Sequence, residues 1–257
     1  MEMKKKGGTA VLSRNGKILG NCQSGSVSLR ENYVIKASGI VQRFGEREVL
    51  KGIDLAICPG EIFGLLGPSG GGKTTLIKIL TGQLKQTAGE AALLGKDVRR
   101  MGNTVQRLGM MMEDSGLYER LSCYDNLKLF ARIYGVLDDK IDEVLERAGL
   151  GECKKRPVAK LSKGMRGSLS LARAVLHEPE ILFLDEPSSG LDPATAARIH
   201  ELIQKEQKRG GAVFLTTHNM EEAYKICDHV ALLNEGKIVE YGEPKEICRK
   251  YNHQNQL

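Results

Sequence analysis

A glycine-rich segment in the first third of the chain constrains the fold more strongly than any other feature. It matches the pattern G-x-x-x-x-G-K-[ST] and reads Gly67-Pro68-Ser69-Gly70-Gly71-Gly72-Lys73-Thr74, with Thr75 behind it. The short apolar run from residue 62 to 66 precedes the segment and predicts a buried strand. Apolar residues at helical spacing follow it and predict a helix from residue 73 to about 83. A glycine loop between a strand and a helix is typical of α/β proteins that bind phosphate groups.

The residue types in this loop suit the triphosphate of a nucleotide. Glycines let the backbone curl so that consecutive N–H groups point at phosphate oxygens, and the following helix adds the positive end of its dipole. Lys73 is expected to reach the β- and γ-phosphates, and the hydroxyl of Thr74 is expected to bind Mg²⁺. The sequence therefore predicts ATP and Mg²⁺ as the ligands of this loop.

A second motif ends in two carboxylates. Residues 181–184 are apolar, and Asp185 and Glu186 follow them directly. A strand that is buried on both faces delivers its carboxyl end to the edge of a parallel sheet, where α/β proteins bind their ligands. Asp185 is predicted to hold Mg²⁺, and Glu186 is the candidate general base for an attacking water. Such a run is a weak signal alone and becomes a strong one beside a phosphate-binding loop.

Composition limits the classes of protein to consider. The chain has 257 residues, enough for one sizeable core with a smaller subdomain attached. Its net charge of +6 indicates a mixed, solvated surface, while a patch for nucleic acid or anionic lipid is the alternative. No apolar stretch approaches the roughly 20 residues that a transmembrane helix needs. We therefore expect a cytoplasmic protein without a membrane span of its own, whose membrane role would come through a partner.

The rest of the chain predicts strands that alternate with helices, as in an α/β layer fold. Apolar runs at 181–184 and 212–216 flank a predicted helix at 193–208. The helix-rich stretch from about 117 to 177 is interpreted as an inserted subdomain. Residues 1–33 lack sustained periodicity and are expected to be either disordered or a short hairpin. Six cysteines are scattered without a C-x-x-C pair, so they are expected to be free thiols or buried small side chains.

Several further motifs resemble those of the ATP-binding cassette (ABC) ATPases. Residues 161–165, Leu-Ser-Lys-Gly-Met, look like a variant of the Leu-Ser-Gly-Gly-Gln signature of that family. Residues 189–192, Ser-Gly-Leu-Asp, match its D-loop. His218 matches the switch histidine that contacts the γ-phosphate, and Phe44 matches the aromatic residue that stacks on adenine. The resemblance covers nearly all of the chain except the N-terminal extension.

The resemblance implies a P-loop NTPase (RecA-like) core with an antiparallel β subdomain and an inserted helical subdomain, within a domain of residues 34–257. It also implies that two subunits pair head to tail, as a homodimer or with a second ATPase subunit. Ser162 and Gly164 of one chain would then cover the ATP held by the other, and Asp192 would link the two sites. Such a pair would drive a separate membrane permease at the cytoplasmic face of the cell membrane.

Two departures from the family pattern point to a subfamily. Most members carry a glutamine in the loop before the helical subdomain, and here Glu113 occupies its place, near the expected Mg²⁺ and γ-phosphate. Lys163 and Met165 replace a glycine and the glutamine of the signature. These features are similar to ATPases of peptide-antibiotic export and self-protection, including the bacitracin and lantibiotic types. They favour an exporter of peptide antibiotics or other toxic compounds.

Two other functional classes stay open at this point. A non-transport ABC ATPase that acts on ribosomes or DNA usually resembles two fused cassettes or carries long coiled coils, and this chain shows neither, so nucleic acid is not an expected partner. A nucleotide-dependent regulator would hydrolyse little ATP, and the intact residues Asp185, Glu186 and His218 argue against that class. Co-purification with membranes separates the transporter from the first alternative, and turnover separates it from the second.

Overall fold

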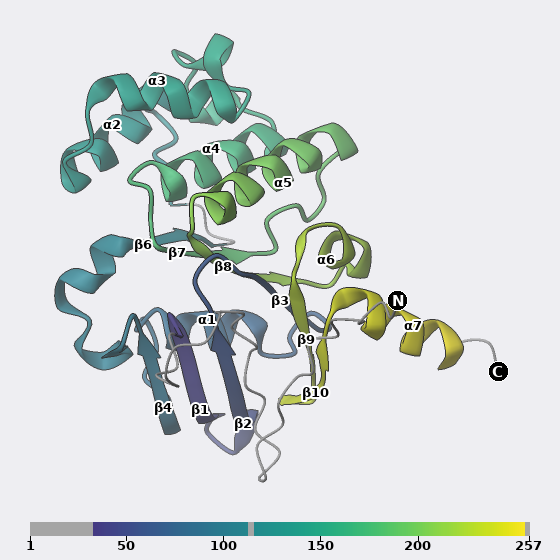
Figure 1. The fold of residues 1–257 in the computed structure, drawn as a ribbon. Coiled ribbons are helices and arrows are strands. Elements are labelled where there is room, and N and C mark those ends of the chain that lie inside the picture. Colours follow the sequence, from purple (N-terminus) through teal and green to yellow (C-terminus); the bar gives the residue numbers. More distant parts are fainter. Residues whose placement is uncertain (1–32, 113–115, 255–257) are drawn as a thin grey trace, which may run out of the picture.

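The computed structural model describes residues 33–112 and 116–254 of the chain. The predicted N-terminal extension, apart from its last residue, and Glu113 lie outside these described residues. Within them the chain forms two sheets and a set of helices that stack in layers (Figure 1).

The larger sheet carries the predicted phosphate-binding motifs. Its strand order is β10-β9-β3-β8-β7-β6, and all of its strands run parallel except β10 at one edge. Because β3, β8 and β7 are neighbours, the segments that follow these three strands meet at one end of the sheet. The bounds are β3 (Ile62–Leu66), β6 (Leu108–Met111), β7 (Ile181–Asp185), β8 (Ala212–Thr217), β9 (His229–Asn234) and β10 (Lys237–Gly242).

A smaller antiparallel sheet lies on the other side of helix α1 (Lys73–Leu80), which is therefore enclosed between two sheets (Figure 1). Its order is β2-β1-β4-β5. One apolar cluster joins the layers: it contains Leu76 of α1, Ile53 of the small sheet and Phe63 of the large sheet. The bounds are β1 (Ile35–Phe44), β2 (Arg47–Ile57), β4 (Ala88–Leu93) and β5 (Lys96–Asp97).

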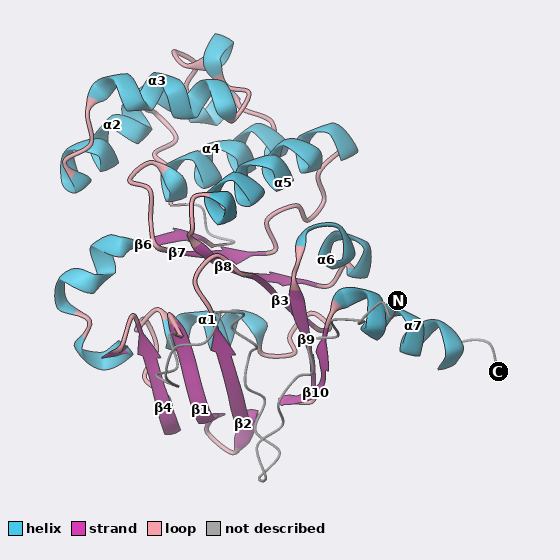
Figure 2. Cartoon of the chain, in the orientation of Figure 1, coloured by secondary structure: helices cyan, strands magenta, loops and turns pink. Residues whose placement is uncertain are grey.

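Helices cover the opposite face of the large sheet. The helices α4 (Lys163–Val175) and α5 (Pro193–Lys208) pack on it, and α2 (Cys123–Tyr134) and α3 (Asp138–Arg147) lie beyond them (Figure 2). Along β7, Leu182 and Leu184 belong to the cluster that includes these helices, whereas Ile181 and Phe183 belong to the cluster of α1. This alternation follows the period of two along a strand and shows why the strand is apolar throughout.

Two helices near the end of the chain complete the fold. The helix α6 (Met220–Ile226) follows β8, and α7 (Pro244–Gln254) follows β10 and extends away from the body of the molecule (Figure 1). No helix among the described residues is both long enough and apolar enough to span a bilayer.

The mixed α/β architecture predicted from the sequence is confirmed. The strand at 62–66 is found where it was expected, and the helix after the glycine loop begins at Lys73. That helix ends at Leu80, short of the predicted residue 83, because Gly82 turns the chain with a φ of +72°. The helices α2, α3 and α4 all fall within 117–177, and their grouping as a subdomain stays a prediction.

The cysteines within the described residues follow the prediction with one exception. Cys123, Cys153, Cys227 and Cys248 are free thiols. Burial raises the pKa of Cys227 far above its usual value, so this thiol is inert at neutral pH. Cys58 is disulfide-bonded, and the expectation of a free thiol is wrong for this residue.

Candidate active site

The loop between β3 and α1 needs its glycines for two physical reasons. Gly70 and Gly72 have φ values of +72° and +103°, which residues with a Cβ rarely adopt. A Cβ on Gly67 would lie only 2.5 Å from the carbonyl oxygen of Leu233 in β9. The glycines therefore permit both the curled backbone and its close approach to the sheet, as a phosphate-binding loop requires.

Lys73 begins α1 and is almost fully buried, with 5% of its surface exposed. Its ammonium donates to the carbonyl oxygen of Gly67 at 2.8 Å and to that of Pro68 at 3.2 Å. Its Nζ also lies 3.1 Å from Oε1 of Glu186, directly after β7. A buried ammonium needs such acceptors, and these three hold the cation against the glycine loop.

Asp185 connects the loop to the centre of the large sheet. Its buried carboxylate accepts hydrogen bonds from the hydroxyl of Thr74 at 2.7 Å and from that of Thr216 at 2.5 Å. The two hydroxyls compensate for removing the charge from water. The oxygens of Thr74 and Asp185 therefore lie side by side, and a hydroxyl with a carboxylate is the kind of ligand set that Mg²⁺ takes in nucleotide sites.

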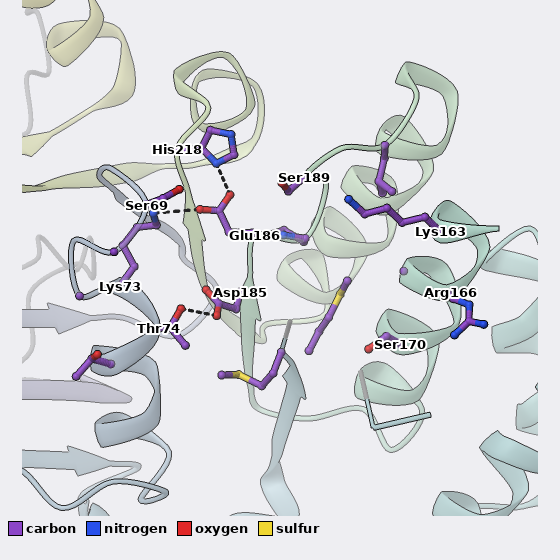
Figure 3. Close-up of a pocket in the computed structure, with 18 residues that line it drawn as sticks. Ser69, Lys73, Thr74, Lys163, Arg166, Ser170, Asp185, Glu186, Ser189 and His218 are labelled. Carbon is purple, nitrogen blue, oxygen red and sulfur yellow. Dashed lines mark hydrogen bonds and ion pairs between the residues drawn. The ribbon is translucent and has the colours of Figure 1, made fainter. Parts of the chain in front are cut away.

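Glu186 has a left-handed backbone conformation, with a φ of +52°. This conformation costs a residue with a Cβ about 1 kcal/mol or more, so its neighbours must hold it. The N–H of Glu186 donates to both the carbonyl oxygen and the hydroxyl of Thr216, each at 3.1 Å. The carboxylate then lies between Lys73 and His218, whose Nδ1 is 2.6 Å from Oε2 (Figure 3). Backbone strain of this kind is concentrated at functional positions.

These residues line a cleft of about 590 Å³ between the glycine loop and α4. Figure 3 shows Lys73, Asp185 and Glu186 on one side of the cleft and Lys163 and Arg166 of α4 on the other. The volume is within the range of roughly 300–1,000 Å³ that is usual for small-molecule sites. The predicted site residues that line the cleft are Ser69, Gly70, Gly72, Lys73, Thr74, Thr75, Asp185, Glu186 and His218.

Other predicted site residues lie outside this lining. Gly67, Pro68 and Gly71 belong to the loop but do not line the cleft, and Phe44 is half exposed at the end of β1. Ser162 is the N-cap of α4, and its hydroxyl accepts from the N–H of Met165 at 3.2 Å.

Gly164 and Asp192 both have structural roles where α4 packs against α5. A Cβ on Gly164 would lie 3.2 Å from a methyl group of Thr195, so the glycine permits the contact. Asp192 is the N-cap of α5 and accepts from the N–H groups of Ala194 and Thr195 at 3.1 and 3.0 Å. The hydroxyl of Thr195 also lowers the pKa of Asp192. The roles of Ser162, Gly164 and Asp192 toward ATP stay predictions.

Several residues in and behind the cleft were not predicted from the sequence. Thr216 is buried behind the cleft and holds both Asp185 and the backbone of Glu186; its signal in the sequence was its place two residues before His218 in an apolar strand. Arg166 lines the cleft and forms an ion pair with Glu119. Ser170 and the methionines 111 and 112 also line the cleft, without a signal in the sequence that separates them from core residues.

Comparison with known proteins agrees with this geometry. The family model described as ABC transporter matches residues 50–189, more than half of the chain. The chain is 39% identical to the fluoroquinolones export ATP-binding protein of Mycobacterium tuberculosis over 217 residues, which cover 83% of this chain and 72% of that protein. It is 32% identical to the lantibiotic transport ATP-binding protein SrtF of Streptococcus pyogenes, over 86% of this chain and 97% of that protein.

Solved structures give the same result. The chain is similar to cbiO1 from Clostridium perfringens, part of the ABC transporter complex cbiONQ, with a TM-score of 0.76 and 29% identity over 87% of this chain and 93% of that one. An ATP-binding subunit of an ABC transporter also has a TM-score of 0.76, at 26% identity, over 85% and 93% of the two chains. The predicted P-loop NTPase fold and ATPase activity are therefore confirmed. The chain belongs to the ABC transporter family, as an ATP-binding and ATP-hydrolysing subunit.

Proposed function

We propose that the cleft between the glycine loop and α4 binds Mg-ATP and that Glu186 is the general base for its hydrolysis. The observation that carries the proposal is the position of the Glu186 carboxylate, 3.1 Å from Lys73 and 2.6 Å from His218. Lys73 would bind the β- and γ-phosphates, because it is the cation held directly against the loop. The carboxylate beside it is then close enough to the terminal phosphate to orient a water and take its proton.

The residues present fit Mg²⁺. Thr74 and Asp185 would hold the ion, since their oxygens already lie 2.7 Å apart. Mg²⁺ keeps several waters and needs only one or two carboxylates from the protein, so this small ligand set is sufficient. When bound, the ion neutralises charge that develops on the phosphate oxygens. Glu113, predicted to lie near the same ion, is outside the described residues and keeps that role as a prediction.

We also propose that two subunits share their sites. Ser162 caps the N-terminus of α4, and Lys163 follows it at the first helical position. A helix N-terminus with a hydroxyl and a nearby cation suits a phosphate. Ser162, unlike the neighbouring Lys163, does not line the cleft of its own chain, which favours a role for Ser162 at the site of a second subunit, where Gly164 and Asp192 would join it.

A membrane permease is the partner that the family implies, and we propose that the pair drives export. Two relatives are named for the export of fluoroquinolones and for lantibiotic transport. The departures from the signature at Lys163 and Met165 support the same direction. The protein would work in the cytoplasm, at the inner face of the cell membrane, and the permease would determine which toxic compound or peptide antibiotic leaves.

A groove of about 240 Å³ is the candidate surface for that permease. Phe130 and Tyr134 of α2 line it. Met110, within β6, and Met112, directly after β6, line it as well. Ile133 beside them on α2 is 67% exposed. An apolar groove beside an exposed aliphatic side chain suits the apolar face of a short helix from a partner. Met112 lines both this groove and the cleft, so a permease helix in the groove would sense changes near the phosphate site.

Steady-state release of phosphate tests the proposed chemistry. The wild-type protein is expected to hydrolyse ATP with Mg²⁺ and to lose this activity with excess chelator. Glu186→Gln removes the base and should lower kcat by a factor of about a hundred or more, since general base catalysis contributes on the order of 10²–10⁴. The matched control is Glu180→Gln, because Glu180 is an exposed glutamate that directly precedes β7, at the opposite end of the strand from Glu186. Equal turnover in wild type and Glu186→Gln would rule out the assigned base.

A further inference from the structure

A buried polar cluster lies behind the Glu186–His218 pair. Glu222, in the first turn of α6, is 4% exposed. Its Oε1 accepts a hydrogen bond from the hydroxyl of Ser188 at 2.5 Å and lies 3.1 Å from Nε2 of His200. The hydroxyl of Thr217 is a third hydrogen-bond partner. These partners come from the loop after β7, from α5 and from the end of β8.

The partners keep the buried carboxylate of Glu222 charged. Burial alone would raise its pKa, but hydrogen bonds from His200, Ser188 and Thr217 outweigh this effect and lower the pKa. The backbone N–H of Glu222 is held as well, because it donates to the side chain of Asn219 at 3.3 Å. The N-terminus of a helix also favours a negative charge. The first turn of α6 is therefore tied to three neighbouring segments.

His218 has much less to hold it. Its side chain is 54% exposed, and its ring pairs with the carboxylate of Glu186. It lies on the short connection between Thr217, the last residue of β8, and Met220, the first residue of α6. The position of His218 consequently follows the position of the first turn of α6.

We propose that Glu222 is a positioning residue for the catalytic pair. Through Ser188 it holds the loop that follows Glu186, and through its own place in α6 it holds the segment that carries His218. Glu222 is not among the residues that line the cleft, so it acts on the reaction through these two segments. They then move together, and the distance between Glu186 and His218 is preserved as they move. This inference rests on the function proposed above for Glu186 and His218.

A double-mutant cycle on ATP hydrolysis tests the proposal. Glu222→Ala is expected to lower kcat on the order of ten- to a hundredfold, because a displacement near 1 Å costs this much, while KM for ATP changes by less than about threefold. In a His218→Ala background the same substitution should lower kcat by less than about twofold, since the Glu186–His218 distance that Glu222 preserves no longer exists.

The chain offers a matched control in a second buried pair. Glu61 is 7% exposed and its Oε1 lies 2.9 Å from Nδ1 of His229, at the opposite end of β3 from the phosphate loop. Glu61→Gln should leave kcat unchanged in both backgrounds. Ser188→Ala removes one bond to Glu222 and is the milder variant if Glu222→Ala does not fold; it should show the same loss and the same dependence on His218.

Two kinetic outcomes would overturn the proposal. One is an unchanged kcat in folded Glu222→Ala; the other is an equal loss with and without the His218 side chain. NMR gives a readout that is independent of turnover: the ring signals of His218 should shift in Glu222→Ala or Ser188→Ala and stay in place in Glu61→Gln. Unshifted signals would overturn the positioning role. Absence of Mg-ATP turnover in the wild type would instead contradict the proposed function, and the NMR result would then decide this inference alone.

Discussion

The ammonium of Lys73 lies 3.1 Å from Oε1 of Glu186, so the first residue of α1 contacts the residue that follows β7. Through this ion pair the glycine loop and the proposed base are in direct contact. A triphosphate on the loop carries more negative charge than a carboxylate. We therefore expect bound ATP to compete with Glu186 for Lys73 and to leave the carboxylate available to a water.

Lys73 should dominate the affinity for nucleotide. Lys73→Ala removes a buried cation that would make charged hydrogen bonds to phosphate, each worth about 1.5–3 kcal/mol, so the Kd for ATP should rise by at least about tenfold. Lys78→Ala, an exposed lysine of the same helix, is the control and should bind normally. Titration calorimetry measures the Kd for ATP in both variants. Wild-type affinity in Lys73→Ala would contradict the assignment of this loop as the phosphate-binding site.

Asp185 should set the requirement for Mg²⁺. Asp185→Asn removes the charge and keeps an acceptor oxygen for only one of the two hydroxyls, of Thr74 and Thr216, so the Mg²⁺ concentration for half-maximal turnover should rise by about tenfold or more. The control is Asp97→Asn, at an exposed carboxylate paired with Arg99. An unchanged Mg²⁺ dependence in the Asp185 variant would show that the ion is held elsewhere.

Glu186→Gln should also change the oligomeric state. The variant keeps the shape of the side chain, so it should still bind ATP, and without hydrolysis the ATP-bridged dimer should persist. Gel filtration with Mg-ATP should show a dimer for Glu186→Gln and mainly monomer for the variant that also carries Lys73→Ala. A monomer in both cases would argue against sites shared between two chains.

The Glu61–His229 pair predicts a pH-dependent contribution to stability. The hydrogen bond that His229 donates to Glu61 raises the pKa of His229, against burial that lowers it. The folded pKa is therefore above the unfolded value of about 6.5. The pair then stabilises the fold fully below that pH, and the contribution is lost as pH rises through the folded pKa. Glu61→Gln should lower the free energy of unfolding by about 1–2 kcal/mol at pH 6 and by less at pH 9 in urea titrations. An equal loss at both values would contradict this account.

Local patterns explain which parts of the fold could be predicted. The strand at 62–66 and the start of the following helix could be predicted from short-range patterns. A continuous apolar run gives way to a glycine-rich loop and then to apolar residues at helical spacing, all within a few residues. The strand β6 was missed, because Leu108 to Met111 has no alternation and pairs with a strand more than 70 residues later. A Cβ on Gly109 in this strand would lie 2.3 Å from the carbonyl oxygen of Ala174, so packing against α4 determines its residue type.

The same limit applies to the candidate site. Lys73, Thr74, Asp185 and Glu186 were predicted because each follows or precedes a recognisable run, and the structure brings these four together. The cluster around Glu222 could not be predicted, since its partners lie 34, 22 and 5 residues away on separate segments. Contacts of this kind depend on how β8, α5 and the loop after β7 come together in space.

Turnover per subunit, measured across protein concentration with Mg-ATP, is the sharpest test of whether Glu186 hydrolyses ATP at a site shared by two chains. We expect Mg²⁺-dependent hydrolysis that rises per subunit as concentration increases, because each site is completed by a second chain, and we expect Glu186→Gln to lower this hydrolysis by about a hundredfold or more at every concentration. Wild-type turnover in Glu186→Gln, or no turnover by the wild type at any concentration, would contradict this proposal.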